Sequence, residues 1–375
     1  MKVLHVVENL HNGAVENWLV RMLGHARRND VDADWTFYCA HGLPGRLDEQ
    51  ARGLGAKVVH SPVPIGRKAD FARALRDELN SGAYPVMHCH HDLVSAMYLA
   101  ASIGTPVKKR IVHVHNADES VLTPSKVKQL LLKEPMRKVC IAMADRIAAN
   151  SNHTLDTFLA GRERKPERDV VHLYGVDPAA FAGPAPDRRA FRASLGLPAE
   201  AKLLLFAGRL VPEKNPVFAV DVLAELVALD PRAFGIFAGA GGEEAAVRER
   251  IAAHGLGESV RMLGWRNDVA QVMRSADWFI LPHPEEPMEG FGLAVVEAQL
   301  AGLRLLLSTG IADDPLLPSA RYSRLPLAAG AASWAAAAVA LDALPAPSAD
   351  AARAELAESA MDMDRALASL RGLYQ

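Results

Sequence analysis

The feature that most constrains the fold is a regular alternation of short, β-branched apolar runs with longer helical stretches. The run Lys2–Val7 is followed by a helical pattern at Val15–Arg28, and this order recurs along the chain. Strands that alternate with helices predict a parallel sheet with helices on both faces. The other strands expected in the first half are Trp35–Ala40, Lys57–His60, Val86–His90, Lys109–His115, Arg146–Asn150 and Asp169–Leu173.

The alternation restarts after a connector at Gly183–Pro198, which begins Gly-Pro-Ala-Pro, holds a short Arg-rich helix and ends Leu-Gly-Leu-Pro. A chain of 375 residues is too long for one ordinary core. We expect an N-terminal domain over 1–182, a C-terminal domain over 183–354, and a helix at about 355–375 that packs back on the first domain. The strands expected after the connector are Leu203–Ala207, Phe234–Gly239, Val260–Leu263, Trp278–Leu281 and Arg304–Ser308.

Composition excludes several classes of protein. The net charge of −2 argues against bulk nucleic-acid binding. The cysteines Cys39, Cys89 and Cys140 are few, odd in number and far apart, so they fit a reducing compartment and predict neither a disulfide framework nor a metal site. The start Met1–Asn9 does not resemble a signal peptide, and no apolar run of 18 residues is present, so we expect a cytoplasmic protein.

The stretch 285–301 carries two acids, Glu289 and Glu297, across a predicted loop-to-helix junction. The helix is expected to begin at Leu293, which places the N–H groups of Phe291, Gly292 and Leu293 between the acids. Such N–H groups suit an anionic oxygen, and carboxylates suit sugar hydroxyls. The pattern is typical of a nucleotide-sugar site, and the alternative is two ordinary surface acids.

The loop Gly208–Pro216 follows the first strand of the second domain and holds Arg209 and Lys214. Their charges can converge on a diphosphate, Arg as a fork and Lys as a point charge. The loop lacks Gly-Lys-Ser/Thr and is therefore not a P-loop. The alternative is that both side chains are solvated surface cations.

Histidines end two strands of the first domain. His113 and His115 are expected on one face of a strand, and His115, nearer the strand's end, is a candidate contact to a reacting sugar. The alternative is a packed, hydrogen-bonded imidazole. A second group, His88–His91, suggests zinc, but without acidic partners at fixed spacing we expect no metal site.

Two further strand-end turns are candidate contacts. Gly13, at the start of the first helix, would let the backbone approach a phosphate or a sugar ring. The turn Gly264–Asp268, with Arg266 and Asn267, could meet a nucleobase, or it could be an ordinary turn with Asp268 as a helix cap. The first turn lacks Gly-x-Gly-x-x-Gly, which disfavours a dinucleotide site.

These residues together resemble a known family. The motif from Gly208 to Lys214, combined with Glu289-Gly-Phe-Gly-Leu-x-x-x-Glu297-Ala, resembles the retaining GT-B glycosyltransferases of family 4. The stretch Leu307–Leu327, followed by Trp334, resembles the branch that builds bacterial exopolysaccharide and capsule.

The resemblance implies an α/β GT-B fold, two doubly wound Rossmann-like domains facing across a cleft. It implies that Arg209 and Lys214 hold the donor diphosphate, Glu297 the ribose and Glu289 the sugar hydroxyls, with the amides of 291–293 near the phosphate. His115 would contact the donor sugar, and Gly13 would lie under the phosphate and acceptor.

The same resemblance implies no cofactor and no metal. The donor would be a UDP- or GDP-sugar and the acceptor a glycan or a lipid-linked sugar. Retention would proceed by front-face departure and attack, with the leaving phosphate oxygen as base. Asn12-Gly13, Tyr174-Gly175 and Gly302-Leu303-Arg304 depart from the family's usual residues and weaken any assignment of the donor.

Other functions remain open on sequence grounds. A sugar-nucleotide epimerase on the same fold would need additional acid/base residues, and a non-catalytic two-lobed sugar- or nucleotide-binding module would not need Lys214 or Glu289. The segment 126–138 is basic with an apolar stripe, so it could lie on the inner face of the plasma membrane and meet a lipid-linked acceptor. The alternative is a solvated basic helix packed by its leucines.

Overall fold

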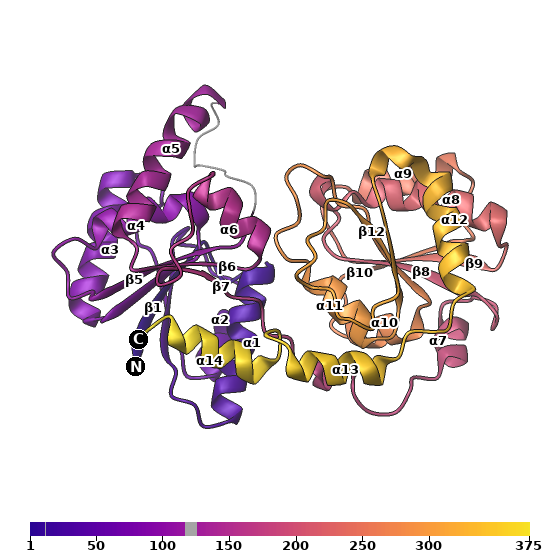
Figure 1. Cartoon of the computed structure of the whole chain (residues 1–375), viewed down its shortest axis with the longest axis horizontal. Coiled ribbons are helices and arrows are strands. Elements are labelled where there is room, and N and C mark those ends of the chain that lie inside the picture. The colour runs from indigo at the N-terminus through magenta and orange to yellow at the C-terminus, as the bar shows by residue number, and fades with distance from the viewer. Residues whose placement is uncertain (12, 117–125) are drawn as a thin grey trace. The chain divides into compact units, whose positions relative to one another are not determined.

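The computed structural model describes residues 1–11, 13–116 and 126–375, and contacts within it divide the chain into two compact units. The first unit comprises Met1–Gly175 with Ala360–Gln375, and the second comprises Val176–Ser359 (Figure 1). The contact boundary lies a few residues before the division expected from the connector at 182/183.

The first unit is built on a seven-stranded parallel sheet in the order β3-β2-β1-β4-β5-β6-β7. Its strands are β1 (Lys2–Val7), β2 (Asp34–Cys39), β3 (Lys57–His60), β4 (Val86–Cys89), β5 (Lys109–Val114), β6 (Arg146–Ala149) and β7 (Asp169–Val171). Its helices are α1 (Ala14–Arg28), α2 (Asp48–Gly53), α3 (Lys68–Gly82), α4 (Ser95–Ala101), α5 (Lys126–Met143), α6 (Asn152–Leu159) and α14 (Met363–Gly372), with a 3₁₀ turn η1 at Asp92–Val94.

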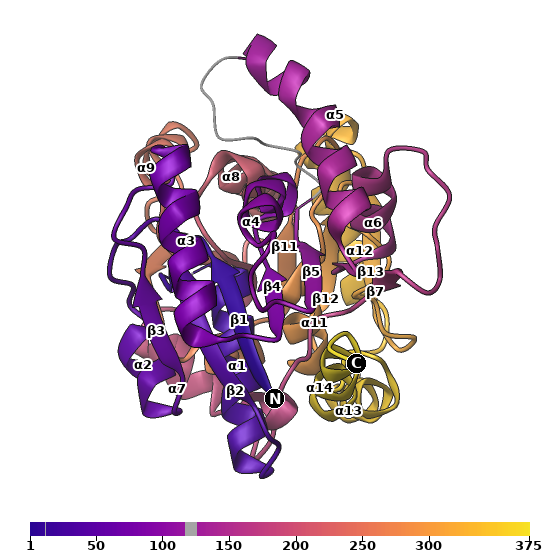
Figure 2. The same ribbon diagram turned by 90° about the vertical axis from the view of Figure 1, so that its left-hand side faces the viewer.

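Helices cover both faces of this sheet, as a doubly wound fold requires. Figure 2 shows α3, α4, α5 and α6 on one face, where their apolar side chains form one core with alternate residues of the strands. The other face receives α1 and α14. The C-terminal helix α14 therefore belongs to the first unit, where His25 of α1 pairs with Asp364 at 2.6 Å.

The second unit holds a six-stranded parallel sheet in the order β10-β9-β8-β11-β12-β13. Its strands are β8 (Lys202–Ala207), β9 (Ala233–Ala238), β10 (Val260–Gly264), β11 (Trp278–Leu281), β12 (Arg304–Ser308) and β13 (Tyr322–Leu325). Its helices are α7 (Arg188–Ser194), α8 (Pro216–Leu229), α9 (Glu244–Ala253), α10 (Val269–Ser275), α11 (Leu293–Leu300), α12 (Gly330–Asp342) and α13 (Ala349–Glu358), with 3₁₀ turns at Pro178–Phe181 (η2), Pro212–Lys214 (η3) and Leu327–Ala329 (η4).

The strands and helices predicted from periodicity are present, with ends shifted by a few residues. Two elements were not predicted, α6 and β13. One predicted detail is wrong. The single helix expected at about 355–375 is two helices, α13 and α14. No described helix is long and apolar enough to cross a membrane.

In each sheet, the loop after the first strand contacts the loop after the second strand through the same backbone hydrogen bond and the same close approach of a glycine to a carbonyl oxygen. In the first unit the Leu47 N–H donates to the Leu10 carbonyl oxygen at 2.9 Å, and a Cβ at Gly45 would lie 2.1 Å from that oxygen. In the second unit the Glu243 N–H donates to the Leu210 oxygen at 2.9 Å, and a Cβ at Gly241 would lie 2.2 Å from it. Both contacts require glycine, because any Cβ would meet backbone.

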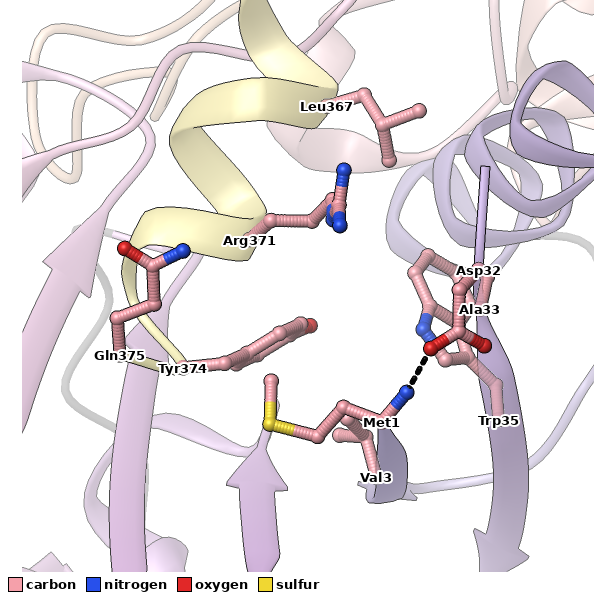
Figure 3. A pocket seen from close by; sticks show the side chains of 9 residues that line it. All are labelled: Met1, Val3, Asp32, Ala33, Trp35, Leu367, Arg371, Tyr374 and Gln375. Atoms are coloured by element: carbon pink, nitrogen blue, oxygen red, sulfur yellow. Dashed lines mark hydrogen bonds and ion pairs between the residues drawn. The ribbon is translucent and has the colours of Figure 1, made fainter. Parts of the chain in front are cut away.

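A small cavity of about 50 Å³ lies beside the first strands of the first unit (Figure 3). Its side chains come from the start of β1, from β2 and from the end of the chain: Met1, Val3, Asp32, Ala33, Trp35, Leu367, Arg371, Tyr374 and Gln375. It has room for little more than a water molecule. It lies at the amino end of β1, where parallel α/β sheets do not place their ligands.

A layer of six buried histidines lies on the face of the first sheet that α1 and α14 cover. The side chains alternate along β1, β4 and β5, so they reach one face, as expected for His113 and His115. They are His5, His88, His90, His113, His115 and His172. Trp18 of α1 packs on this layer, with its ring 5.4 Å from that of His113 and 5.6 Å from that of His172.

Burial keeps these imidazoles neutral. It lowers the pKa of His5 and His115 to about 3 and that of His172 to about 4. Burial, together with the neighbouring histidines, also lowers the pKa values of the other three well below the ordinary value.

The histidine layer predicts strong acid sensitivity. An unfolded histidine binds a proton below about pH 6.5, whereas the buried ones do not, so the unfolded state binds more protons and the free energy of unfolding falls as pH falls. Below about pH 6.5, each buried neutral imidazole lowers the free energy of unfolding by up to about 1.4 kcal/mol for every unit that the pH falls. We expect the urea midpoint to drop steeply between pH 7 and pH 5.

A pair of variants isolates the effect. His172→Gln removes one buried proton acceptor and should reduce the pH slope of the unfolding free energy by up to one proton. His11→Gln changes an exposed histidine and should leave the slope unchanged. A midpoint that stays constant from pH 7 to pH 5 would contradict neutral burial of the layer.

Candidate active site

The candidate site of the second unit lies where its strand order reverses. The loop after β8 carries Arg209 and Lys214, and the loop after the neighbouring strand β11 carries Glu289. Loops at such a switch point diverge on opposite faces of the sheet and leave room for a ligand at the carboxyl ends of the strands. The structure therefore brings these three predicted residues to one edge of one sheet.

Lys214 and Glu289 contact each other directly. The Lys214 ammonium donates to Glu289 Oε2, and both side chains are less than one-fifth exposed. The sequence prediction gave them separate partners, a diphosphate and a sugar. In this structure the two charges compensate each other, because each is too poorly hydrated to stay unpaired at low cost.

The backbone fixes where Glu289 stands. Its N–H donates to the Gly310 carbonyl oxygen at 2.9 Å, and it forms an isolated parallel bridge with Ile311, just after β12. Gly310 itself touches the preceding loop, since a Cβ there would lie 2.1 Å from the oxygen of Pro284. The carboxylate therefore stands on a loop braced by β11 and β12.

Positive charge surrounds this carboxylate. Burial alone would raise the pKa of Glu289, but the charge of Lys214, that of His283, the hydrogen bond from Lys214 and the charge of Arg209 outweigh it, so its pKa lies below the ordinary value. Arg209 is exposed, whereas Lys214 is partly buried. The site can thus offer two cations and one carboxylate to a ligand.

His283 is a site residue that sequence reasoning missed. It is buried, its Nε2 lies 3.5 Å from Glu289 Oε2, and its Nδ1–H donates to the Pro284 oxygen at 2.8 Å. Burial lowers its pKa. Its position two residues beyond the end of β11 is the signal that could have found it, because strand ends carry the ligands in this fold.

The helix α11 begins beside this group. Gly292 takes a left-handed conformation, φ +80°, immediately before Leu293, the first residue of the helix. The first turn of a helix presents N–H groups without intrahelical acceptors and a partial positive charge, both of which suit a phosphate. The Phe291 side chain is buried, and Glu297 lies one turn into the helix, partly buried.

The side chains of the turn after β10 bond to one another. Arg266 makes a two-pronged ion pair with Asp268, at 2.7 and 2.5 Å. The oxygen of Asn267 accepts from the indole N–H of Trp265 at 3.2 Å. Asp268 does not cap α10 through its side chain. The side chains of Arg266 and Asn267 therefore already have partners within the turn.

In the first unit the ring nitrogens of His115 are both engaged. Its Nε2 pairs with His90 at 3.0 Å and its Nδ1 with the Tyr174 hydroxyl at 2.6 Å. Asp92, which sequence reasoning missed, accepts the His115 backbone N–H at 2.8 Å, and burial raises its pKa to about 6. Contact between a His115 ring nitrogen and a sugar would require one of these bonds to break.

Gly13 lies just before α1, in an extended conformation. The carboxylate of Glu16 stands against it: a Cβ at Gly13 would lie 2.1 Å from Glu16 Oε2. An acidic side chain therefore occupies the helix N-terminus where the sequence predicted a phosphate. Asn12, the other half of the predicted turn, lies outside the described residues.

The second unit matches a known protein family, and relatives extend the match into the first. Residues 187–311, which include Arg209, Lys214, Glu289 and Glu297, match the family model described as Glycosyl transferases group 1. The Bacillus subtilis protein named as glycosyltransferase EpsF is 27% identical over 341 residues, covering 89% of this chain and 86% of EpsF. A D-inositol 3-phosphate glycosyltransferase of Jonesia denitrificans is 32% identical, over 59% of this chain and about half (54%) of that relative.

Solved structures share the fold along the whole chain. Anabaena Alr3699/HepE in complex with UDP superimposes with a TM-score of 0.79 at 19% identity, covering 100% of this chain and 99% of HepE. The lipopolysaccharide glycosyltransferase WaaG superimposes with a TM-score of 0.69 at 16% identity, covering 99% and 100% of the two chains. With two parallel-sheet units and these structural neighbours, the chain has the GT-B fold, and its residues 187–311 are similar to the glycosyl transferases group 1 family.

Proposed function

We propose that this protein is a retaining glycosyltransferase of family 4 that takes its sugar from a UDP-sugar. The observation that carries the proposal is the Lys214–Glu289 pair, with Arg209 beside it and the start of α11 next to it. A nucleotide-sugar brings what this group lacks, a diphosphate for the cations and hydroxyls for the carboxylate.

When the donor binds, Lys214 and Glu289 exchange their contact with each other for contacts with the donor. The diphosphate takes over Lys214 and draws in the exposed Arg209, which frees Glu289 to accept hydrogen bonds from the sugar. The amides at Phe291–Leu293 meet the phosphate, and Glu297 holds the ribose. The backbone of the turn at Arg266 and Asn267 lies along the base. Because the cations are already fixed by the fold, little reorganisation remains for the transfer step.

Transfer proceeds on one face of the sugar. The bond between the anomeric carbon and the phosphate oxygen breaks, the acceptor oxygen attacks from the same side, and the leaving phosphate oxygen takes the acceptor's proton. Arg209, Lys214 and the start of α11 stabilise the departing diphosphate, so the step needs no metal ion or other cofactor. In the first unit, His115 contacts the sugar after exchanging one hydrogen bond, and Gly13 faces the phosphate and acceptor once the Glu16 carboxylate has turned away from it.

The names of similar proteins support the donor and the pathway. HepE has been crystallised with UDP and with UDP-glucose, and WaaG is described as acting in lipopolysaccharide biosynthesis. A UDP-sugar is therefore a better first candidate than a GDP-sugar. The acceptor that fits these names is a glycan or a lipid-linked sugar of a bacterial surface polysaccharide.

Lys214→Ala and Glu289→Ala should each reduce sugar transfer by about 100-fold or more, because each removes one member of the group that holds the diphosphate or the sugar. Initial rates with UDP-sugars measure the loss. Thermal shift with UDP measures binding separately, since a ligand that binds the folded state raises the melting temperature. The UDP-induced shift should shrink in Lys214→Ala.

Matched controls come from the same unit. Glu244 and Arg248 form an exposed ion pair on α9, and alanine at either should leave transfer unchanged. Near-normal turnover in both Lys214→Ala and Glu289→Ala would refute the donor site. A larger thermal shift with GDP than with UDP would show that the donor is a GDP-sugar. A product with the inverted anomeric configuration would refute retention. A transfer rate that rises with added Mg²⁺ or Mn²⁺ would refute metal-free transfer. Conversion of the donor without acceptor would favour an epimerase.

We also propose that α5 holds the protein at the inner face of the plasma membrane. The alternative, a helix packed by its leucines, does not hold for Leu131 and Leu132, which are 67% and 36% exposed. Packing on the core comes instead from Met136 and Val139, further along the helix. Exposed Lys138 on the same helix suits anionic lipid, and Figure 1 shows α5 projecting from the rest of the first unit.

Replacing Leu131 and Leu132 together by Glu should lower binding to phosphatidylglycerol vesicles at low salt by at least about tenfold, since two apolar side chains lose their lipid contacts. Co-sedimentation measures it. Leu229→Glu, at a leucine 58% exposed in the second unit, is the control and should bind like the wild type. Absence of wild-type binding at low salt would remove the membrane proposal.

A further inference from the structure

Three potential metal ligands converge in the first unit, at the carboxyl ends of β2 and β3. Cys39 is the last residue of β2, His60 is the last residue of β3, and Asp48 is the first residue of α2, which connects the two strands. One ligand atom of each lies within 4.8 Å of the others. Cys39 and Asp48 are buried, and the His60 side chain is about one-fifth exposed, which leaves a route from solvent.

The contact between Asp48 and His60 is close but is not a hydrogen bond. His60 Nε2 lies 2.8 Å from Asp48 Oδ2, yet Nε2 has no hydrogen-bond partner of acceptable geometry. Asp48 Oδ1, also buried, has no partner among the described residues. Two ligand atoms of one tetrahedral zinc ion lie about 3.3 Å apart, so a nitrogen and a carboxylate oxygen this close, with no hydrogen bond between them, can bind the same ion.

The chemistry of the three side chains suits a divalent transition metal. Thiolate, imidazole and carboxylate are the zinc ligands of proteins, and two negative charges would balance a dication. The Leu10 backbone opposes the effect of burial and lowers the pKa of the Cys39 thiol, but burial is the larger effect. Burial raises the pKa of the free thiol to about 12, so metal binding would release its proton.

The geometry points to a zinc-class metal site formed by Cys39, Asp48 and His60, with water as the fourth ligand. The sequence offered no sign of it, because the three residues are separated by irregular spacings and Cys39 stands far from the other cysteines. The histidine layer is a weaker candidate. It contains no acid, and its ring nitrogens pair with one another at 3.0 to 3.2 Å.

A metal ion here would join β2, β3 and α2 at the edge of the first sheet. Its role would be to stabilise the fold, because a metal that binds only the folded state raises the free energy of unfolding. The site is independent of the proposed transferase function, whose charged donor residues belong to the second unit. Its test therefore needs neither donor nor acceptor.

The test uses the full chain, freed of metal by a chelator and then titrated with Co²⁺ and Zn²⁺ alone. Co²⁺ should produce the near-ultraviolet charge-transfer band of a cobalt–thiolate bond, and one equivalent of Zn²⁺ should abolish it and raise the melting temperature. Cys39→Ser should lose the band. Asp48→Asn and His60→Gln should weaken Zn²⁺ binding by at least about tenfold.

Two controls decide between this site and others. Cys140→Ser removes a buried thiol outside the described metal-ligand groups and should keep the band. His113→Gln alters the histidine layer and should keep Zn²⁺ affinity. If Cys39→Ser does not fold, His60→Gln still tests the site, because His60 is partly exposed and its substitution disturbs the core less. Absence of Zn²⁺ binding by the wild type, or loss of it in His113→Gln but not in His60→Gln, would overturn the proposal.

Discussion

Every pair of neighbouring strands is parallel, and this determines where polar and charged side chains can meet in this protein. In a parallel sheet all strands end at one edge, so side chains distant in sequence meet there if their strands are neighbours. Lys214 and Glu289 are 75 residues apart and touch because β8 and β11 pair. His5 and His90 are 85 residues apart and their rings bond because β1 and β4 pair. The two units place different chemistry on the same scaffold.

In the first unit, the six buried histidines lie on one face of the parallel sheet, and most of them form hydrogen bonds with one another or with tyrosines. Two chains of paired rings cross the strands, one from His5 through His90 and His115 to Tyr174, the other from Tyr374 through His88 to His113. Each neutral imidazole has one donor and one acceptor, so the direction of the proton in one ring fixes it in the next. A side chain at the end of either chain, such as Tyr174, therefore influences the tautomer of the others.

These chains are not completely satisfied. The Nε2 atoms of His5, His113 and His172, and the indole nitrogen of Trp18, are buried without a hydrogen-bond partner among the described residues. Each such atom costs about 1 to 3 kcal/mol relative to a paired one. The layer is thus held in place by the packing of α1 and α14 on it, and not by its hydrogen bonds alone.

The sequence predicted the architecture and the sheet edge at which Arg209, Lys214 and Glu289 lie, because periodicity and strand-end position depend on local pattern. It did not predict which side chains pair. That Lys214 would meet Glu289 depends on the path of two loops, and that Glu16 would cover Gly13 depends on a rotamer. Two elements, α6 and β13, were also missed, although strands as short as β7 were predicted.

The buried histidines were visible as strand-end residues, but their partners were not. Periodicity places His113 and His115 on one face, yet only the paired strands and α1 show that six imidazoles share that face and that His115 has both nitrogens bonded. Asp92 and His283 lie in loops just past strand ends, where the loop path decides what a side chain touches.

The contact between the first two loops of each unit has a consequence for how those loops can move. Leu10 with Gly45 and Leu210 with Gly241 make the same carbonyl-on-glycine contact, with the same hydrogen bond two residues further on. Both sheets also order their first six strands in the same way. Because each contact joins backbone to backbone and leaves no room for a Cβ, the loop after the first strand of each sheet moves only together with the loop after the second. In the second unit this ties the loop of Arg209 and Lys214 to the loop that precedes α9.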